Sequence, residues 1–152
     1  MSSAEEDVHR RLLRARDLMD RRYADPLDTR RLAEVALMGT SHFIREFRRV
    51  FGETPHRYLQ RRRVERAMQL LRDTDASVTD ICLTVGFTSL GTFSRRFSEV
   101  TGASPTAYRA RASTLGLRAP TSFTMRWTRP ADLGARPAED GDFGEASPSR
   151  PT

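Results

Sequence analysis

The sequence contains no lysine, a single cysteine and no long apolar run. One cysteine, Cys82, excludes an intramolecular disulfide, so a reducing cytoplasm is the expected compartment. A membrane-spanning helix needs a run of roughly 18 apolar residues, so no contact with a membrane is expected. The first residues, MSSAEEDVHRRLL, begin with acidic side chains and hold no uninterrupted apolar stretch. That is not the pattern of a secretory signal.

Because lysine is absent, all 26 basic residues are arginine, and the net charge is +6. A GC-rich genome also favours arginine, so the choice of arginine does not by itself predict recognition. Its distribution says more, since residues 1–112 hold 21 arginines and 15 acidic residues, whereas residues 113–152 hold five of each. The positive excess therefore lies in the part that looks folded, as expected of a surface that binds nucleic acid.

Apolar spacing predicts an all-α fold with about seven helices before residue 112. Periodicity, caps and breakers place them near 6–24, 30–37, 41–51, 55–72, 78–85, 89–100 and 106–112. The expected N-caps are Asp28 or Thr29, Thr40 or Ser41, Thr54, Ser77, Thr88 or Ser89, and Ser104. No segment in this range alternates like a strand.

The tail, residues 113–152, has a different composition. Phe123, Met125 and Trp127 alternate with polar residues, which fits a short strand or an extended strap over the body. A docking segment for a partner or for a second copy is the alternative. Residues 136–152 are rich in Pro, Gly, Ser and acidic residues, so we expect them to be disordered.

The chain repeats itself at an offset of 50 residues. Phe43, Arg45, Phe47, Val50, Gly52, Pro55 and Tyr58 match Phe93, Arg95, Phe97, Val100, Gly102, Pro105 and Tyr108. Upstream, Ala33 matches Cys82 at an offset of 49, so the second copy has one extra residue in its turn. Each copy reads as a short helix, a turn and a second helix, with a small residue where the two helices cross. The repeat predicts two helix-turn-helix units.

The second helix of each unit has an apolar face and an arginine face. Its apolar residues lie within about 60° of one another and are predicted to be core: Phe43, Phe47 and Val50, then Phe93, Phe97 and Val100. On the opposite face stand Ser41, Arg45 and Arg48, then Gly91, Arg95 and Ser98. An outward arginine in both copies suits the major groove, because arginine can donate two hydrogen bonds to guanine. Two purely structural helical hairpins are the alternative, which the matched arginines disfavour.

These faces and their edges give the candidate DNA-binding residues. The predicted base-reading set is Ser41, Ile44, Arg45, Arg48, Leu90, Gly91, Ser94 and Arg95. The predicted phosphate-contacting set is Arg30, Thr40, His42, Arg49, Ser89, Thr92 and Arg96. No catalytic motif, metal site or cofactor is predicted, since His9, His42 and His56 lack metal spacing and Cys82 is expected to be core.

The stretch ICLTVGFTSLGTFSRRF (81–97), followed by GASPTAYR (102–109), resembles the DNA-binding domain of the AraC/XylS family of transcription regulators. It is similar to the pattern I-A-x-x-x-G-F-x-(four residues)-F-x-R-x-F-(about seven)-P-x-x-[YF]-R, and the likeness covers about residues 8–112. Cys82 stands where the family usually has alanine, and Ser41 and Ile44 offer less hydrogen bonding than many relatives do. The resemblance implies a subdomain over 8–54, a linker helix over 55–72 and a second subdomain over 77–112.

The resemblance further implies a sequence-specific, bacterial, cytoplasmic and nucleoid-associated transcription regulator without enzymatic activity. Its recognition helices, about 41–51 and 89–100, would read adjacent major grooves of double-stranded DNA. It resembles short family members that consist of this unit alone, act as monomers, and activate transcription through RNA polymerase. A dimer formed through the tail is the alternative.

Geometry adds an expectation about the DNA. A linker helix of roughly 17 residues is about 25 Å long, whereas successive major-groove faces lie about 34 Å apart. We therefore expect the bound duplex to bend. Two other functions stay open: a module that joins a separate sensor subunit through its tail, and an architectural DNA coater with strong salt dependence and little sequence preference.

Overall fold

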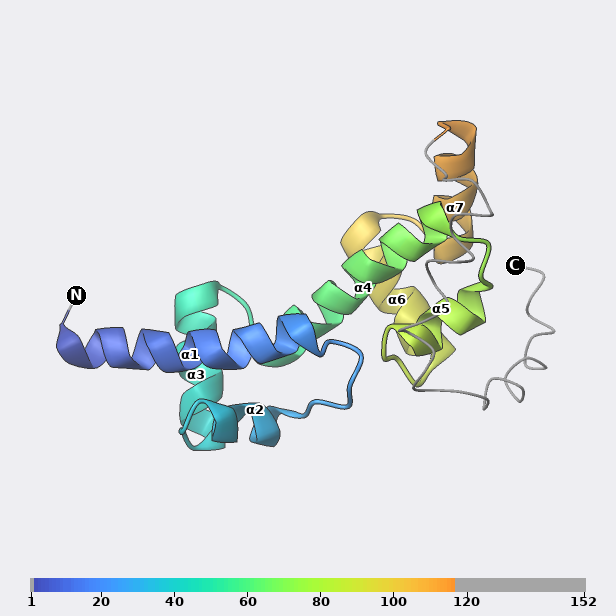
Figure 1. Cartoon of the computed structure of the whole chain (residues 1–152). Coiled ribbons are helices and arrows are strands. Elements are labelled where there is room, and N and C mark those ends of the chain that lie inside the picture. The colour runs from blue at the N-terminus through green and yellow to red at the C-terminus, as the bar shows by residue number, and fades with distance from the viewer. Residues whose placement is uncertain (1, 117–152) are drawn as a thin grey trace. The chain divides into compact units, whose positions relative to one another are not determined.

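The computed structural model describes residues 2–116, and this part of the chain is all-α. Its seven helices are α1 (Ser3–Arg21), α2 (Thr29–Val35), α3 (Thr40–Phe51), α4 (Pro55–Asp73), α5 (Val78–Thr84), α6 (Leu90–Thr101) and α7 (Pro105–Thr114) (Figure 1). The predicted fold class and helix number are confirmed. The segment with Phe123, Met125 and Trp127 lies outside the described residues. None of these helices is long and apolar enough to cross a membrane.

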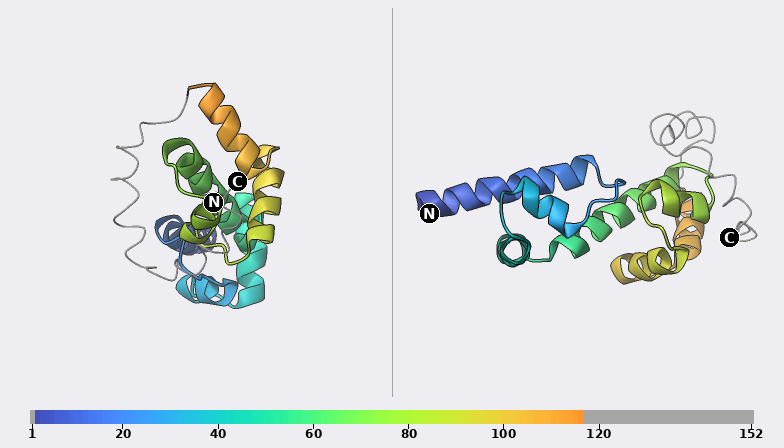
Figure 2. Two further views of the ribbon diagram at one scale, coloured as in Figure 1. Left: turned by 90° about the vertical axis from the view of Figure 1, so that its right-hand side faces the viewer. Right: turned by 90° about the horizontal axis from the view of Figure 1, so that it is seen from below.

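Within the described residues the chain divides into two compact units, residues 2–62 and 63–116. The division falls inside α4, so this helix begins in the first unit and ends in the second. In the first unit α1, α2 and α3 pack on one another, and in the second α6 packs on both α5 and α7 (Figure 2). Each unit therefore contains one helix-turn-helix pair, α2–α3 or α5–α6.

Side-chain caps begin most of the helices. The predicted caps are confirmed for Asp28, Ser77, Ser89 and Ser104, each of which accepts a hydrogen bond from a backbone N–H three residues ahead. The prediction for α3 was wrong, because its N-cap is Gly39, with no side-chain bond, and both Thr40 and Ser41 already lie in the helix. Helix α1 begins earlier than its apolar stripe, since Ser2 caps it and acidic residues follow in its first turn.

A series of aromatic rings in contact forms the centre of each unit's core. In the first, Phe47 packs against Phe43, Phe51 and Tyr58 with ring centroids 5.6, 4.6 and 5.7 Å apart. In the second, Phe93 contacts Phe87 at 5.2 Å and Phe97 at 5.7 Å, and Phe97 contacts Tyr108 at 5.5 Å. Phe43, Phe47, Phe93 and Phe97 have no exposed surface. The predicted core faces of α3 and α6 are thus confirmed for their phenylalanines.

The prediction that Val100 is core was wrong, because this side chain is 43% exposed. Its counterpart Val50 packs against the first core beside Phe51, which contacts His9 of α1 at 6.3 Å. In α6 the residue at the register of Phe51 is Thr101, whose hydroxyl bonds the carbonyls of Phe97 and Ala103. Thr101 offers no ring to cover the end of α6, so Val100 stays open to solvent.

The two helix-turn-helix turns share one hydrogen-bond pattern but differ in a key residue. The Leu37 N–H donates to the backbone carbonyl of Glu34 at 3.0 Å, and the Gly86 N–H donates to the backbone carbonyl of Leu83 at 3.1 Å. Both residues are left-handed, with φ of 58° at Leu37 and 105° at Gly86. Glycine adopts this conformation without steric cost, whereas leucine does not. The Leu37 side chain is also 68% exposed, so it contributes little packing.

We therefore expect Leu37→Gly to raise the free energy of unfolding by up to about 1.5 kcal/mol. The change removes roughly 1–2 kcal/mol of left-handed strain and adds about 0.5–1 kcal/mol of backbone entropy cost. Urea unfolding followed by circular dichroism measures the difference. Leu37→Ala is the matched control, because it shortens the side chain but keeps the strain. If the alanine variant gains as much as the glycine variant, backbone strain at Leu37 is not the cause.

Candidate nucleic-acid interface

Helix α3 presents arginines on the side opposite its buried phenylalanines. Arg45, Arg48 and Arg49 are exposed. Arg49 is held by Glu46 of the same helix at 2.7 Å, and this hydrogen bond keeps the pKa of the Glu46 carboxyl below its usual value. Among the described residues, Arg45 and Arg48 have no hydrogen bond or ion pair. Their guanidinium groups are therefore free to donate to an external acceptor.

The other predicted residues of α3 lie around this face. Thr40, Ser41 and His42 are exposed, near the N-terminal end of the helix. Ile44 is only half-buried and lies at the edge between the arginine face and the core. Before α3 in the sequence, Arg30 of α2 is exposed and makes no side-chain bond within the described range. The first unit thus offers one polar and strongly basic helix surface.

Helix α6 repeats the arrangement with fewer charges. Arg95 and Gly91 are exposed, and Arg95 has no hydrogen bond or ion pair to any described residue. Leu90 is 39% exposed at the start of the helix. Thr92, Ser94 and Arg96 are half-buried, and Arg96 pairs with Glu99 at 2.8 Å. The Oγ of Ser89 accepts the Thr92 N–H at 3.1 Å, so this cap is already engaged.

Gly91 is not required by the fold. A Cβ added at this position would meet only the Ser89 Oγ, at 3.8 Å, which is an ordinary contact. Glycine within a helix costs roughly 0.5–1 kcal/mol relative to alanine. A glycine that the structure does not need, on an exposed helix face, is typical of a place where another molecule approaches the backbone closely.

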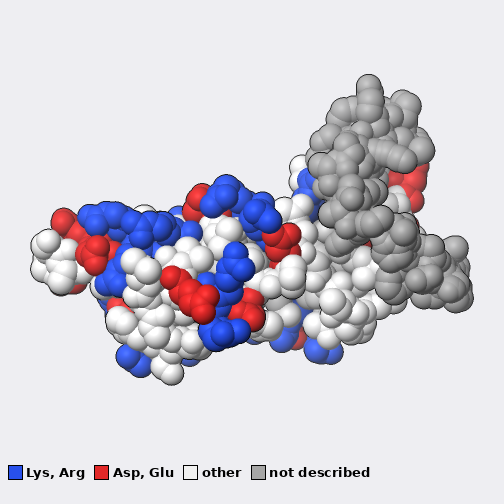
Figure 3. Space-filling model, turned by 60° about the horizontal axis from the view of Figure 1, so that its bottom comes forward, with Lys and Arg blue, Asp and Glu red and all other residues white. Residues whose placement is uncertain are grey.

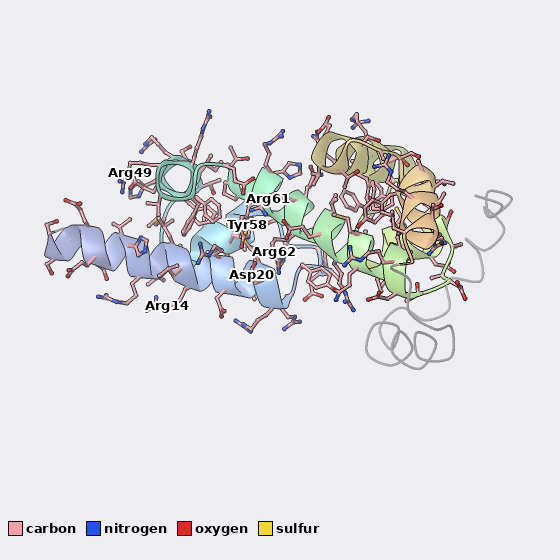
Figure 4. The ribbon with its side chains drawn as sticks, turned by 90° about the horizontal axis from the view of Figure 1, so that it is seen from above. Arg14, Asp20, Arg49, Tyr58, Arg61 and Arg62 are labelled. Carbon is pink, nitrogen blue, oxygen red and sulfur yellow. The ribbon has the colours of Figure 1, made fainter. Side chains whose placement is uncertain are left out.

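A polar cluster fastens α4 to α1 in the first unit. The Tyr58 hydroxyl donates to Asp20 at 2.7 Å, and Arg62 Nε donates to the same carboxylate at 3.0 Å. Figure 4 shows these three side chains pointing toward one another. Burial, followed by the bond to Asp20, raises the pKa of Tyr58 to about 12. The hydroxyl therefore stays protonated and keeps donating at any physiological pH.

The second unit fastens α7 to the end of α4 differently. Tyr108, the repeat partner of Tyr58, accepts from Arg72 at 2.7 Å instead of donating to a carboxylate. Arg109 donates to the carbonyls of Leu71 and Thr74, both at 3.2 Å, and burial lowers its pKa. These bonds satisfy carbonyls at the C-terminal end of α4, where a helix has no internal donors left. Sequence reasoning matched the two tyrosines but missed their partners.

Cys82 has the packing role predicted for it. The side chain is buried in the core of the second unit. Burial raises the pKa of the thiol to about 12, so the reactive thiolate is not formed near neutral pH. Within residues 2–116, no group of three or more His, Cys, Asp or Glu side chains has an arrangement that could hold a metal ion.

Proteins of known class share this arrangement of helices. A family model described as "Helix-turn-helix domain" matches residues 32–111, which include both α2–α3 and α5–α6. Among solved structures, the DNA-binding domain of AdpA in complex with a target DNA is 31% identical with a TM-score of 0.66. That match covers 68% of this chain and 94% of the AdpA domain. The protein is a double helix-turn-helix protein.

An AraC-type regulator from Chromobacterium violaceum is 30% identical with a TM-score of 0.63, covering 69% of this chain and 94% of that one. The MmsAB operon regulatory protein of Pseudomonas aeruginosa is 38% identical over 85 residues, which are 56% of this chain and 28% of that protein. The melibiose operon regulatory protein of Escherichia coli is 34% identical over 87 residues, 57% of this chain and 29% of that protein. This chain spans less than a third of these two curated relatives. It belongs to the AraC/XylS family.

Proposed function

We propose that this chain binds specific sequences in double-stranded DNA and regulates transcription. The observation that carries the proposal is the pair Arg45 and Arg95. They hold the same register in α3 and α6, are exposed, and have no hydrogen bond or ion pair among the described residues. Each stands opposite a fully buried phenylalanine pair, so a rigid core fixes the helix that presents it.

The proposed division of labour follows from side-chain chemistry. Arg45, Arg48 and Arg95 donate to guanine, whereas the apolar Leu90 contacts a thymine methyl group. Ser41, Ile44, Gly91 and Ser94 complete the two base-reading faces, with Gly91 admitting a close approach. Phosphate oxygens are contacted from the edges by Arg30, Thr40, His42, Arg49, Ser89, Thr92 and Arg96.

Several finer points rest on the family resemblance. We propose that the protein acts in the cytoplasm on the nucleoid, as a monomer whose two helices enter adjacent major grooves of a bent duplex. RNA polymerase is the proposed protein partner, with activation as the outcome. No catalytic step is proposed.

Selection from random duplexes tests the function directly. The purified chain is incubated with duplexes of about 30 base pairs, and bound DNA is amplified and sequenced over several rounds. We expect an asymmetric motif with two half-sites about one helical turn apart, because the two recognition helices differ in sequence. Binding without enrichment of any motif would contradict sequence-specific recognition and favour an architectural role.

A further inference from the structure

The outward faces of α3 and α6 carry different charges at the same register. Position by position, α3 presents Ser41, Arg45, Arg48 and Arg49 where α6 presents Gly91, Arg95, Ser98 and Glu99. The first member of each set is uncharged and the second is arginine in both helices. The last two are both cationic in α3, whereas α6 has a serine and a carboxylate. The first face therefore carries three positive charges and the second carries none in total.

The two helices also differ in which member of their ion pair is exposed to solvent. In α3 the cation is the more exposed partner, since the side chain of Arg49 is 59% exposed and that of Glu46 is 18% exposed. In α6 the carboxylate is the more exposed partner, with Glu99 at 44% and Arg96 at 27%. An approaching polyanion therefore meets a guanidinium at the end of α3 and a carboxylate at the end of α6.

Arginines that make no hydrogen bond, ion pair or ring contact are also concentrated in the first unit. Within residues 2–116, eight arginines have no side-chain hydrogen bond, ion pair or ring contact: Arg14, Arg30, Arg31, Arg45, Arg48, Arg57, Arg95 and Arg111. Six of these belong to the first unit and two to the second. Figure 3 shows basic side chains over much of the face of the first unit that it presents, with acidic ones between them.

We infer that the two units play unequal parts on DNA, and that Glu99 is a specificity-determining residue. The inference rests on the proposed DNA-binding function. The first unit anchors the chain through charge, which any sequence satisfies. In the second unit Glu99 neutralises Arg96 through their ion pair and repels nearby phosphates. Helix α6 therefore binds only where the base contacts of Arg95 compensate for this repulsion. Specificity arises here from a repulsive group that weakens binding to wrong sequences.

The same substitution at equivalent positions tests this inference. Affinities of the wild type, Arg49→Gln and Glu99→Gln are measured across salt concentrations, on the selected duplex and on a scrambled one. Arg49→Gln should weaken binding to both duplexes alike and reduce the slope of log affinity against log salt by about 1. Glu99→Gln should tighten the scrambled complex by about fivefold, equivalent to one charge pair near 4 Å in water. The selected duplex should gain less, so the ratio of specific to non-specific affinity should fall.

Glu6→Gln is the matched control, because it removes the same charge from an exposed position in α1. Thermal unfolding verifies that loss of the exposed Arg96–Glu99 pair leaves the fold intact. The inference is overturned if Glu99→Gln does no more than Glu6→Gln. The repulsive role inferred for Glu99 is overturned if Glu99→Gln weakens the selected complex, because Glu99 then contributes by accepting a hydrogen bond from a base such as cytosine. A wild-type chain that binds neither duplex overturns the proposed function itself.

Discussion

Phe97→Ala should lower the free energy of unfolding by about 3–5 kcal/mol, the cost typical of removing a buried phenylalanine ring. The Phe97 side chain has no exposed surface. Its ring lies between Phe93 at 5.7 Å and Tyr108 at 5.5 Å, so it joins α6 to α7. Alanine would leave a cavity that its neighbours, held on α6 and α7, fill only in part. Urea unfolding followed by far-ultraviolet circular dichroism measures the loss.

Val100→Ala is the control for this prediction, since it lies in the same helix one turn further on. With 43% of its surface exposed, Val100 contributes little to the core. Its truncation should change stability by less than about 1 kcal/mol. Phe47→Ala should repeat the large effect in the first unit, because Phe47 is equally buried among three aromatic rings. A small loss for Phe97→Ala and a large one for Val100→Ala would contradict the observed core.

Local signals in the sequence were sufficient to predict the seven helices. A cap such as Ser89 or Ser104 bonds a backbone N–H only three residues ahead, so the chain carries that information within one turn. The apolar spacing of Phe43 and Phe47 likewise lies within one helix, and its repetition at Phe93 and Phe97 predicted the second unit. Where structure depends on neighbours along the chain, residue patterns predicted it well.

The features that sequence reasoning missed depend on contacts between distant segments. Whether Val100 is buried depends on what covers the end of α6, which the spacing within α6 does not encode. Asp20 meets the Tyr58 hydroxyl across 38 residues, and no short motif marks that pair. The strain at Leu37 was not predicted, because a left-handed residue is usually a glycine, as Gly86 is in the second turn, and leucine gives no such signal.

In the candidate site, too, local features were predictable from the sequence and side-chain pairing was not. The outward position of Arg45 and Arg95 follows from helical periodicity, and both side chains are exposed as expected. The pairing of Arg96 does not follow from it, because Glu99, the one carboxylate of α6, is three residues from Arg96 and four from Arg95, and rotamers decide which of them it pairs with. Which member of a pair faces solvent was therefore learned only from the structure. That detail makes Glu99 a candidate for controlling specificity.

Arg95→Ala should weaken binding to the selected duplex by roughly 1–3 kcal/mol and relax the preference at one base position. An arginine that donates to both O6 and N7 of guanine discriminates against the other bases, and alanine offers neither donor. Arg95 forms no hydrogen bond or ion pair within the described residues, so the fold should be unaffected. Affinities for the selected duplex and for single-base variants of it measure both effects.

Two further variants separate base reading from simple loss of charge. Arg95→Lys keeps the charge but not the fork of two donors, so it should retain non-specific affinity and still lose the base preference. Arg111→Ala removes another exposed arginine, which has no side-chain hydrogen bond or ion pair among the described residues, from α7 and should leave the preference for every base unchanged. If Arg95→Ala binds the selected duplex as tightly as the wild type, α6 does not present Arg95 to DNA. If Arg95→Lys keeps the full preference, the position contributes charge alone, and the reading of that half-site must come from Leu90, Gly91 and Ser94.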